Sequence, residues 1–320
     1  MKYFLCLSFL ILINGCVDSY NGELIFVEPG VNNQFEYPYF LFIPNGISEY
    51  EENYLIIEPN NSGFVDDDLQ KHIEKAKRIV TVDFYLGNWV AQKLKYPLIV
   101  PVFPRPKSEW KIYTHALDRD VMFQKGNSLE RLDIQLLEMC VDAQKRLEGK
   151  NIRIGNRYLL TGFSASGTFA NRFTIMHPEK ILAVAAGGLN GLLMLPMDSI
   201  NNEIVKYPVG TGDFDEITGK EFQRASFLKT PQFYFMGRFD DNDAVPYEDA
   251  FDPYERDQIF NLLGEQMLPD RWDRCRSIYS ANNVNAVFNT YDNIGHEHPE
   301  LIKNDIIKFF ETCIHLDRKR

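Results

Sequence analysis

The chain has 320 residues, of which 45% are hydrophobic and 25% charged, and these ordinary globular proportions exclude a disordered chain, a collagen-like repeat and a coiled coil. Its formal net charge of −11 argues against a nucleic-acid-binding protein, because contacts to phosphates require clustered Lys and Arg side chains. The length would allow two domains, but single α/β domains also reach this size.

The N-terminal segment over residues 1–15 predicts a signal peptide of the lipoprotein type. Lys2 precedes an apolar run over residues 3–13, which has the length of a secretory hydrophobic segment and is too short to span a bilayer. The run ends in Ile13-Asn14-Gly15-Cys16, which resembles the lipobox of bacterial lipoproteins. We therefore expect cleavage before Cys16, lipidation of its thiol and anchoring of the exported protein to a membrane of the bacterial cell envelope. An ordinary signal peptide, which would give a secreted or periplasmic soluble protein, is the alternative.

The rest of the chain alternates apolar runs typical of strands with amphipathic stretches typical of helices. Strands are expected at residues 39–44, 54–59, 98–104, 157–161, 181–186, 232–236 and 285–291. Helices are expected at residues 66–94 with Asp66 as N-cap, from Ser128 onward, from 163 to about 177, and at 299–315. This alternation predicts an α/β fold with a mostly parallel central sheet and helices on both faces.

The domain organisation follows from the lack of a Pro- or Ser-rich linker. We expect one domain over residues 38–320, preceded by a tether and the first strands at 16–37. Residues 189–230 have no clear hydrophobic period and carry Gly and Pro, so they are expected to form an insertion or lid. The cysteines Cys140, Cys275 and Cys313 are expected to be buried thiols, although a Cys275–Cys313 disulfide stays possible.

The candidate nucleophile is Ser164, in the sequence Gly162-Phe163-Ser164-Ala165-Ser166-Gly167. An apolar strand precedes this turn and an amphipathic helix follows it. A G-x-S-x-G turn of this kind exposes a Ser between a strand and a helix, and its flanking residues must be small because the two elements approach closely. Ser166 stands where the second Gly is usual, and Gly167 follows it.

A nucleophilic Ser needs a base and an acid that orients the base, in the chain order Ser, acid, His for this kind of fold. Asp240 follows the strand-ending Gly237 and is the favoured acid, with Asp243 as the alternative. His296 follows the last expected strand and is the favoured base, with His298 as the alternative.

The oxyanion hole requires two backbone N–H groups directed at the developing negative charge. Ala165, directly after the nucleophile, is expected to supply one of them. Asn61 or Asn60, in the loop after the second expected strand, is expected to supply the other.

These motifs together resemble the α/β-hydrolase superfamily. The stretch from Ser164 to Phe173, followed by His177-Pro178, is similar to secreted esterases and polyester depolymerase-like serine hydrolases. The resemblance implies acyl transfer through a Ser-His-Asp triad on a small-molecule or polymeric ester, without a metal or an organic cofactor. A serine peptidase on the same scaffold and a catalytically silent, surface-anchored binding lipoprotein are the alternatives. The oligomeric state is left open.

Overall fold

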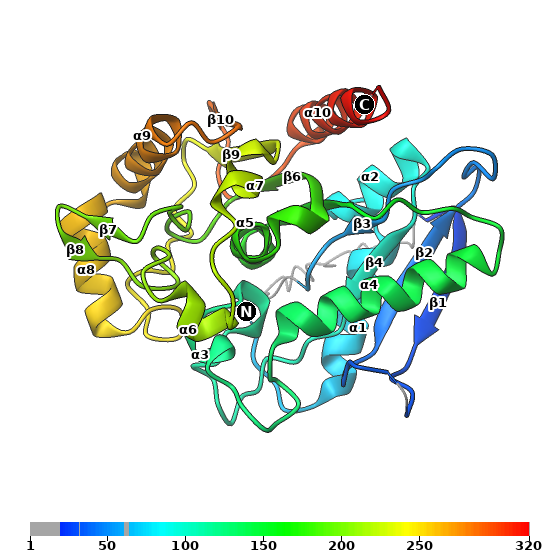
Figure 1. The fold of residues 1–320 in the computed structure, drawn as a ribbon, viewed down its shortest axis with the longest axis horizontal. Coiled ribbons are helices and arrows are strands. Elements are labelled where there is room, and N and C mark those ends of the chain that lie inside the picture. The colour runs from blue at the N-terminus through cyan, green and yellow to red at the C-terminus, as the bar shows by residue number, and fades with distance from the viewer. Residues whose placement is uncertain (1–19, 32, 61–63, 320) are drawn as a thin grey trace, which may run out of the picture.

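The computed structural model describes residues 20–31, 33–60 and 64–319 (Figure 1). Within them lies an eight-stranded sheet with the strand order β1-β2-β4-β3-β5-β6-β9-β10. Its strands are β1 (Gly22–Val27), β2 (Tyr39–Pro44), β3 (Ile56–Ile57), β4 (Leu98–Pro101), β5 (Tyr158–Phe163), β6 (Ile181–Gly187), β9 (Gln232–Gly237) and β10 (Ala286–Tyr291). The pairs β1–β2 and β2–β4 are antiparallel and the remaining pairs are parallel, so the predicted mostly parallel sheet is confirmed.

Helices cover both faces of this sheet, because successive strand residues point to opposite sides. On one face, Phe42 and Leu98 pack in a cluster with residues of α1 (Leu69–Thr81), α2 (Leu86–Leu94) and α10 (Glu300–Asp317). On the other face, Leu41 and Ile99 pack with residues of α4 (Leu132–Glu148), α5 (Ala165–Met176), α8 (Pro253–Leu263) and α9 (Trp272–Ala281). The shorter helical segments are α3 (Arg119–Met122), α6 (Phe214–Thr218), α7 (Arg224–Lys229), a π-helical turn at Met267–Arg271, and 3₁₀ turns at Thr114–Ala116 and Pro178–Lys180.

Three details of the predicted helices are wrong: the single helix at 66–94, its N-cap at Asp66, and the helix start at Ser128. The stretch 66–94 forms α1 and α2, separated at Val82, whose backbone is extended, and the side-chain amide of Asn88 donates to the C=O of Val80. This contact satisfies a carbonyl at the end of α1 and lets the chain turn there. The N-cap of α1 is Asp68, which accepts from the N–H of Gln70. Ser128 does not cap α4, which begins at Leu132. The hydroxyl of Ser128 instead forms a hydrogen bond with that of Tyr37.

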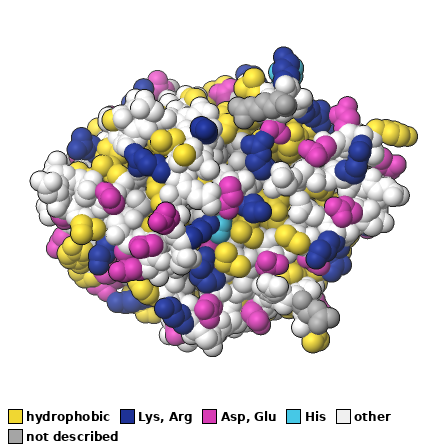
Figure 2. Space-filling view, in the orientation of Figure 1, with side chains coloured by type: hydrophobic (Ala, Val, Ile, Leu, Met, Phe, Trp, Pro, Cys, Tyr) yellow, Lys and Arg dark blue, Asp and Glu magenta, His cyan; other side chains and the backbone are white. Residues whose placement is uncertain are grey.

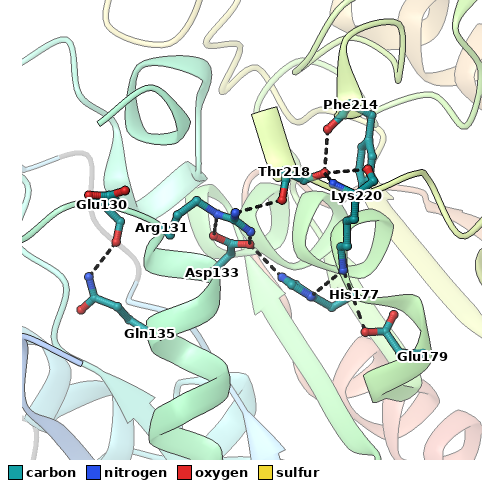
Figure 3. Close-up of polar contacts among 9 residues, drawn as sticks. All are labelled: Glu130, Arg131, Asp133, Gln135, His177, Glu179, Phe214, Thr218 and Lys220. Carbon is teal, nitrogen blue, oxygen red and sulfur yellow. Dashed lines mark hydrogen bonds and ion pairs between the residues drawn. The ribbon is translucent and has the colours of Figure 1, made fainter. Parts of the chain in front are cut away.

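The segment 189–230 contains a small second sheet of β7 (Ser199–Ile200) and β8 (Glu203–Ile204), together with α6 and α7. Its backbone is irregular, but several of its apolar side chains are buried in the main core, among them Leu193, Val205 and Phe227. A polar network also joins it to the rest of the fold (Figure 3). In this network Asp133 of α4 accepts two hydrogen bonds from Arg131, at 2.8 Å each, and pairs with His177 Nε2 at 2.8 Å.

The same network continues from His177 into the segment 189–230. Lys220 Nζ lies 3.2 Å from His177 Nδ1, and Arg131 donates to the C=O of Thr218 at 3.0 Å. Burial acts to raise the pKa of Asp133, but its bonds with Arg131 and His177 outweigh burial and hold that pKa well below the usual range. The network therefore ties three separate parts of the chain together around one buried carboxylate.

The surface carries charges of both signs. Figure 2 shows Lys and Arg side chains interspersed with Asp and Glu over one face, with hydrophobic side chains between them. On that face, the negative net charge is thus not gathered into a single acidic patch. The three cysteines among the described residues are free and buried, as predicted: Cys140, Cys275 and Cys313.

Candidate active site

Ser164 lies at the sharp turn between β5 and α5. Its backbone has φ 61° and ψ −130°, a conformation that L residues rarely adopt and that costs about 1–3 kcal/mol. A Cβ on Gly162 would lie 2.3 Å from the C=O oxygen of Ser166, and one on Gly167 would lie 2.6 Å from that of Gly187. Both positions therefore require glycine, and Gly167 provides the close approach expected from the second Gly of the motif.

Ser166 binds the end of strand β5. Its hydroxyl accepts from the N–H of Phe163 and donates to the C=O of the same residue, both at 2.9 Å. The side chain is fully buried. The departure from the usual Gly at this position therefore adds two hydrogen bonds to the turn and leaves Ser164 in place.

Asp240 and His296 are brought together from the loops that follow β9 and β10. The Nδ1 atom of His296 lies 2.9 and 3.0 Å from the two carboxylate oxygens of Asp240. A Cβ on Gly237 would lie 2.2 Å from the C=O oxygen of Gly295, so glycine lets the two loops approach each other. The Asp240 side chain is 1% exposed and that of His296 is 25% exposed. The acid is therefore shielded from solvent, whereas the base is accessible from solvent.

Asp243, the alternative acid, pairs with Arg271 and not with His296. Its carboxylate forms an ion pair with the fully buried guanidinium of Arg271 and accepts the N–H of Val245. Arg271 also donates to the C=O of Gly191 at 2.9 Å and to that of Glu265 at 2.6 Å. Asp243 therefore fixes the loop through Arg271, whereas Asp240 contacts His296.

His298, the alternative base, is buried among aromatic rings. Its ring lies 4.6 Å from that of Phe163 and 4.9 Å from that of Phe84. Burial, and after it the nearby Lys303, lowers the pKa of His298 to about 4. The ring is thus neutral near pH 7. It packs against Phe163, whose ring also contacts that of His296, and its Nδ1 atom has no hydrogen-bond partner in the part of the chain that the structure describes.

Asn242 is a site residue that the sequence analysis missed. Its side-chain nitrogen, Nδ2, donates to the hydroxyl of Ser164 at 3.3 Å and lies 3.1 Å from His296 Nε2. The sequence offers no signal for this contact, because Asn242 is one polar residue in an acidic loop.

Of the expected oxyanion-hole groups, the N–H of Ala165 is the first of helix α5 and has no partner within the helix. Asn60 is 1% exposed, and neither polar atom of its side chain has a partner among the described residues. Strand β3 runs parallel to β5, with Ile57 opposite Leu160. The chain that leads from β3 to Asn60 therefore reaches the carboxyl end of the sheet, where Ser164 follows β5. Asn61 and Cys16 lie outside the described residues.

No family model matches the chain, and no curated protein matches its sequence significantly. Solved structures do match. The poly(aspartic acid) hydrolase-1 from Sphingomonas sp. KT-1 has a TM-score of 0.57 at 13% identity, over 92% of this chain and 98% of that one. An arylesterase has a TM-score of 0.50 at 11% identity, over 94% and 87% of the two chains.

A third structure, a putative dipeptidyl aminopeptidase IV from Bacteroides ovatus ATCC 8483, has a TM-score of 0.50 at 13% identity, over 92% of this chain and 36% of that one. Together with the strand order, these similarities show that the chain has the α/β-hydrolase fold, as predicted. Within residues 20–31, 33–60 and 64–319, no three or more His, Cys, Asp and Glu side chains are grouped so that they could hold a metal ion.

Proposed function

We propose that this protein is a serine hydrolase that cleaves a carboxylic ester. The observation that carries the proposal is the Asp240–His296 pair, which lies beside a Ser164 held in a strained turn between strand and helix. The fold supports it, because the carboxyl ends of parallel strands are where such sheets place their sites. A binding protein without catalysis would need neither the strained serine nor the paired histidine.

The reaction proceeds in two acyl transfers. His296 Nε2 takes the proton of the Ser164 hydroxyl while the serine oxygen attacks the ester carbonyl carbon, which gives a tetrahedral alkoxide. The alkoxide collapses, the bond to the alcohol oxygen breaks, and His296 returns its proton to that oxygen. Water then attacks the acyl-enzyme in the same way and releases the acid and free Ser164. Asp240 accepts the Nδ1–H of His296 throughout and so fixes the tautomer.

The alkoxide requires donors that are already in position before the reaction. We assign this role to the N–H of Ala165 and to the loop that contains Asn60 and Asn61. No metal and no organic cofactor takes part in these steps.

The leaving group is tested with matched substrates. Two structural neighbours are named for poly(aspartic acid) and for dipeptides, so amides are the competing substrates. We expect higher kcat/KM on nitrophenyl esters than on nitroanilides of the same short-chain or aminoacyl groups. Ser164→Ala should abolish the ester activity above background. Higher kcat/KM on the amides would assign the protein to the serine peptidases, and ester activity that survives in Ser164→Ala would exclude Ser164 as the nucleophile.

We also propose that the protein is exported and anchored to a bacterial envelope membrane through lipid on Cys16. The described residues contain no helix that could cross a membrane, so the proposal rests on the sequence of residues 1–16. Several acyl chains on one cysteine suffice for stable anchoring.

The anchor is tested by Cys16→Ser in the full chain expressed in a bacterium. We expect the variant to move from the membrane fraction to the soluble fraction with the same ester kcat, because the site lies in a separate part of the chain. A Cys16→Ser variant that remains with the membranes would contradict the lipid anchor.

A further inference from the structure

Asn242 occupies the space between the two groups that must exchange a proton. Its Nδ2 atom is 3.3 Å from Ser164 Oγ and 3.1 Å from His296 Nε2. Within the described structure Ser164 Oγ and His296 Nε2 form no hydrogen bond with each other. The structure therefore shows an amide in the place of the contact on which the proposed first step depends.

The direction of these hydrogen bonds follows from the donors and acceptors present. Nδ1 of His296 faces only carboxylate oxygens of Asp240, so it carries the proton and Nε2 carries the lone pair. The amide nitrogen of Asn242 is a donor and cannot accept. It therefore donates to the same lone pair that Ser164 would use, and the two groups compete for one acceptor.

The backbone around Asn242 is held on both sides. The N–H of Asn242 donates to Asp240 Oδ1 at 3.1 Å, and the next residue, Asp243, is paired with the buried Arg271. The side chain of Asn242 itself is exposed to solvent. Rotation of that side chain, with the loop left in place, is therefore the motion that would release Nε2.

We propose that Asn242 is a positioning residue that keeps the free enzyme in a resting state. Its amide holds His296 Nε2 until a bound substrate offers the amide another acceptor oxygen, and the Ser164 hydroxyl then pairs with the base. This inference rests on the proposed serine hydrolase function and adds to it a control on when the nucleophile is activated.

The test measures how fast a small alkyl fluorophosphonate reacts with the full-length protein. In this reaction Ser164 Oγ bonds to phosphorus, its proton passes to His296 Nε2, and fluoride leaves. Rates over a range of probe concentrations give kinact for the chemical step and KI for binding. We expect Asn242→Ala and Asn242→Ser to raise kinact about 5-fold, the equivalent of one neutral hydrogen bond, with little change in KI.

Asp241→Ala is the matched control, because Asp241 is the exposed neighbour of Asn242 in the same loop and should leave kinact unchanged. A role in loop structure alone would lower kinact or leave it unaltered. If the wild-type protein is labelled and neither Asn242 variant exceeds its kinact, the resting-state role is overturned. If the wild-type protein is not labelled at all, the proposed hydrolase function fails instead.

Discussion

Asp240→Asn is expected to lower kcat on a small activated ester by about 10⁴, with KM nearly unchanged. The carboxylate accepts the Nδ1–H of His296 through both of its oxygens, at 2.9 and 3.0 Å. An amide in its place presents a donor to Nδ1 and so favours the tautomer in which Nε2 carries the proton. That imidazole cannot take the proton of Ser164, whereas the substrate can still bind.

Asp243→Asn is the matched comparison, since the two residues lie in the same loop. It removes the charge opposite the buried Arg271, so its cost should fall on the free energy of unfolding, by about 3 kcal/mol, and much less on kcat. Both variants are assayed at a temperature at which each is folded. A nearly inactive Asp243→Asn beside an almost normal Asp240→Asn would show that the wrong acid has been assigned.

Asp133→Asn is expected to lower the free energy of unfolding by about 3 kcal/mol, measured by denaturant unfolding at pH 7. The change takes the negative charge from a fully buried position, leaves one acceptor oxygen where there were two, and sets an amide donor against the N–H groups of Arg131 and His177 (Figure 3). Glu23→Gln is the control, because its pair with Lys150 is exposed and should contribute less than about 1 kcal/mol.

The pH dependence of this difference has a defined sign. Because the pKa of Asp133 is depressed in the folded state, its contribution is complete above the unfolded value of about 3.9 and is lost as the pH falls through the lower, folded value. The difference in the free energy of unfolding between the wild-type protein and Asp133→Asn should therefore be constant near neutral pH and become smaller only below about pH 4. Equal unfolding midpoints at pH 7 would show that the network does not stabilise the fold.

The sequence predicted those features that depend on local pattern. Apolar runs marked most of the strands, and Gly162 and Gly167 marked the turn that holds Ser164. The spacing of Asp240 from Gly237 along the sequence favoured Asp240 over Asp243 as the acid, and the structure pairs Asp240 with His296.

The features that depend on distant contacts could not be predicted. The break between α1 and α2 contains neither Pro nor Gly, and the contact of Asn88 with Val80 across the turn accompanies it. Residues 189–230 show no hydrophobic periodicity, because their irregular backbone forms hydrogen bonds within the segment instead of in regular helices or long strands. One example is the N–H of Leu195, which donates to the C=O of Val209. The position of Asn242 depends on a loop that is held by Arg271, which lies 28 residues further along the chain than Asp243.

The central claim, that Ser164 is the nucleophile, is tested most directly by locating a covalent adduct. The full-length protein is treated with a fluorophosphonate, digested, and analysed by mass spectrometry, with Ser164→Ala treated in parallel. We expect one phosphonyl group per chain, on the peptide that contains Ser164, and none on the variant. An unlabelled wild-type protein, or equal labelling of Ser164→Ala at another residue, would contradict it.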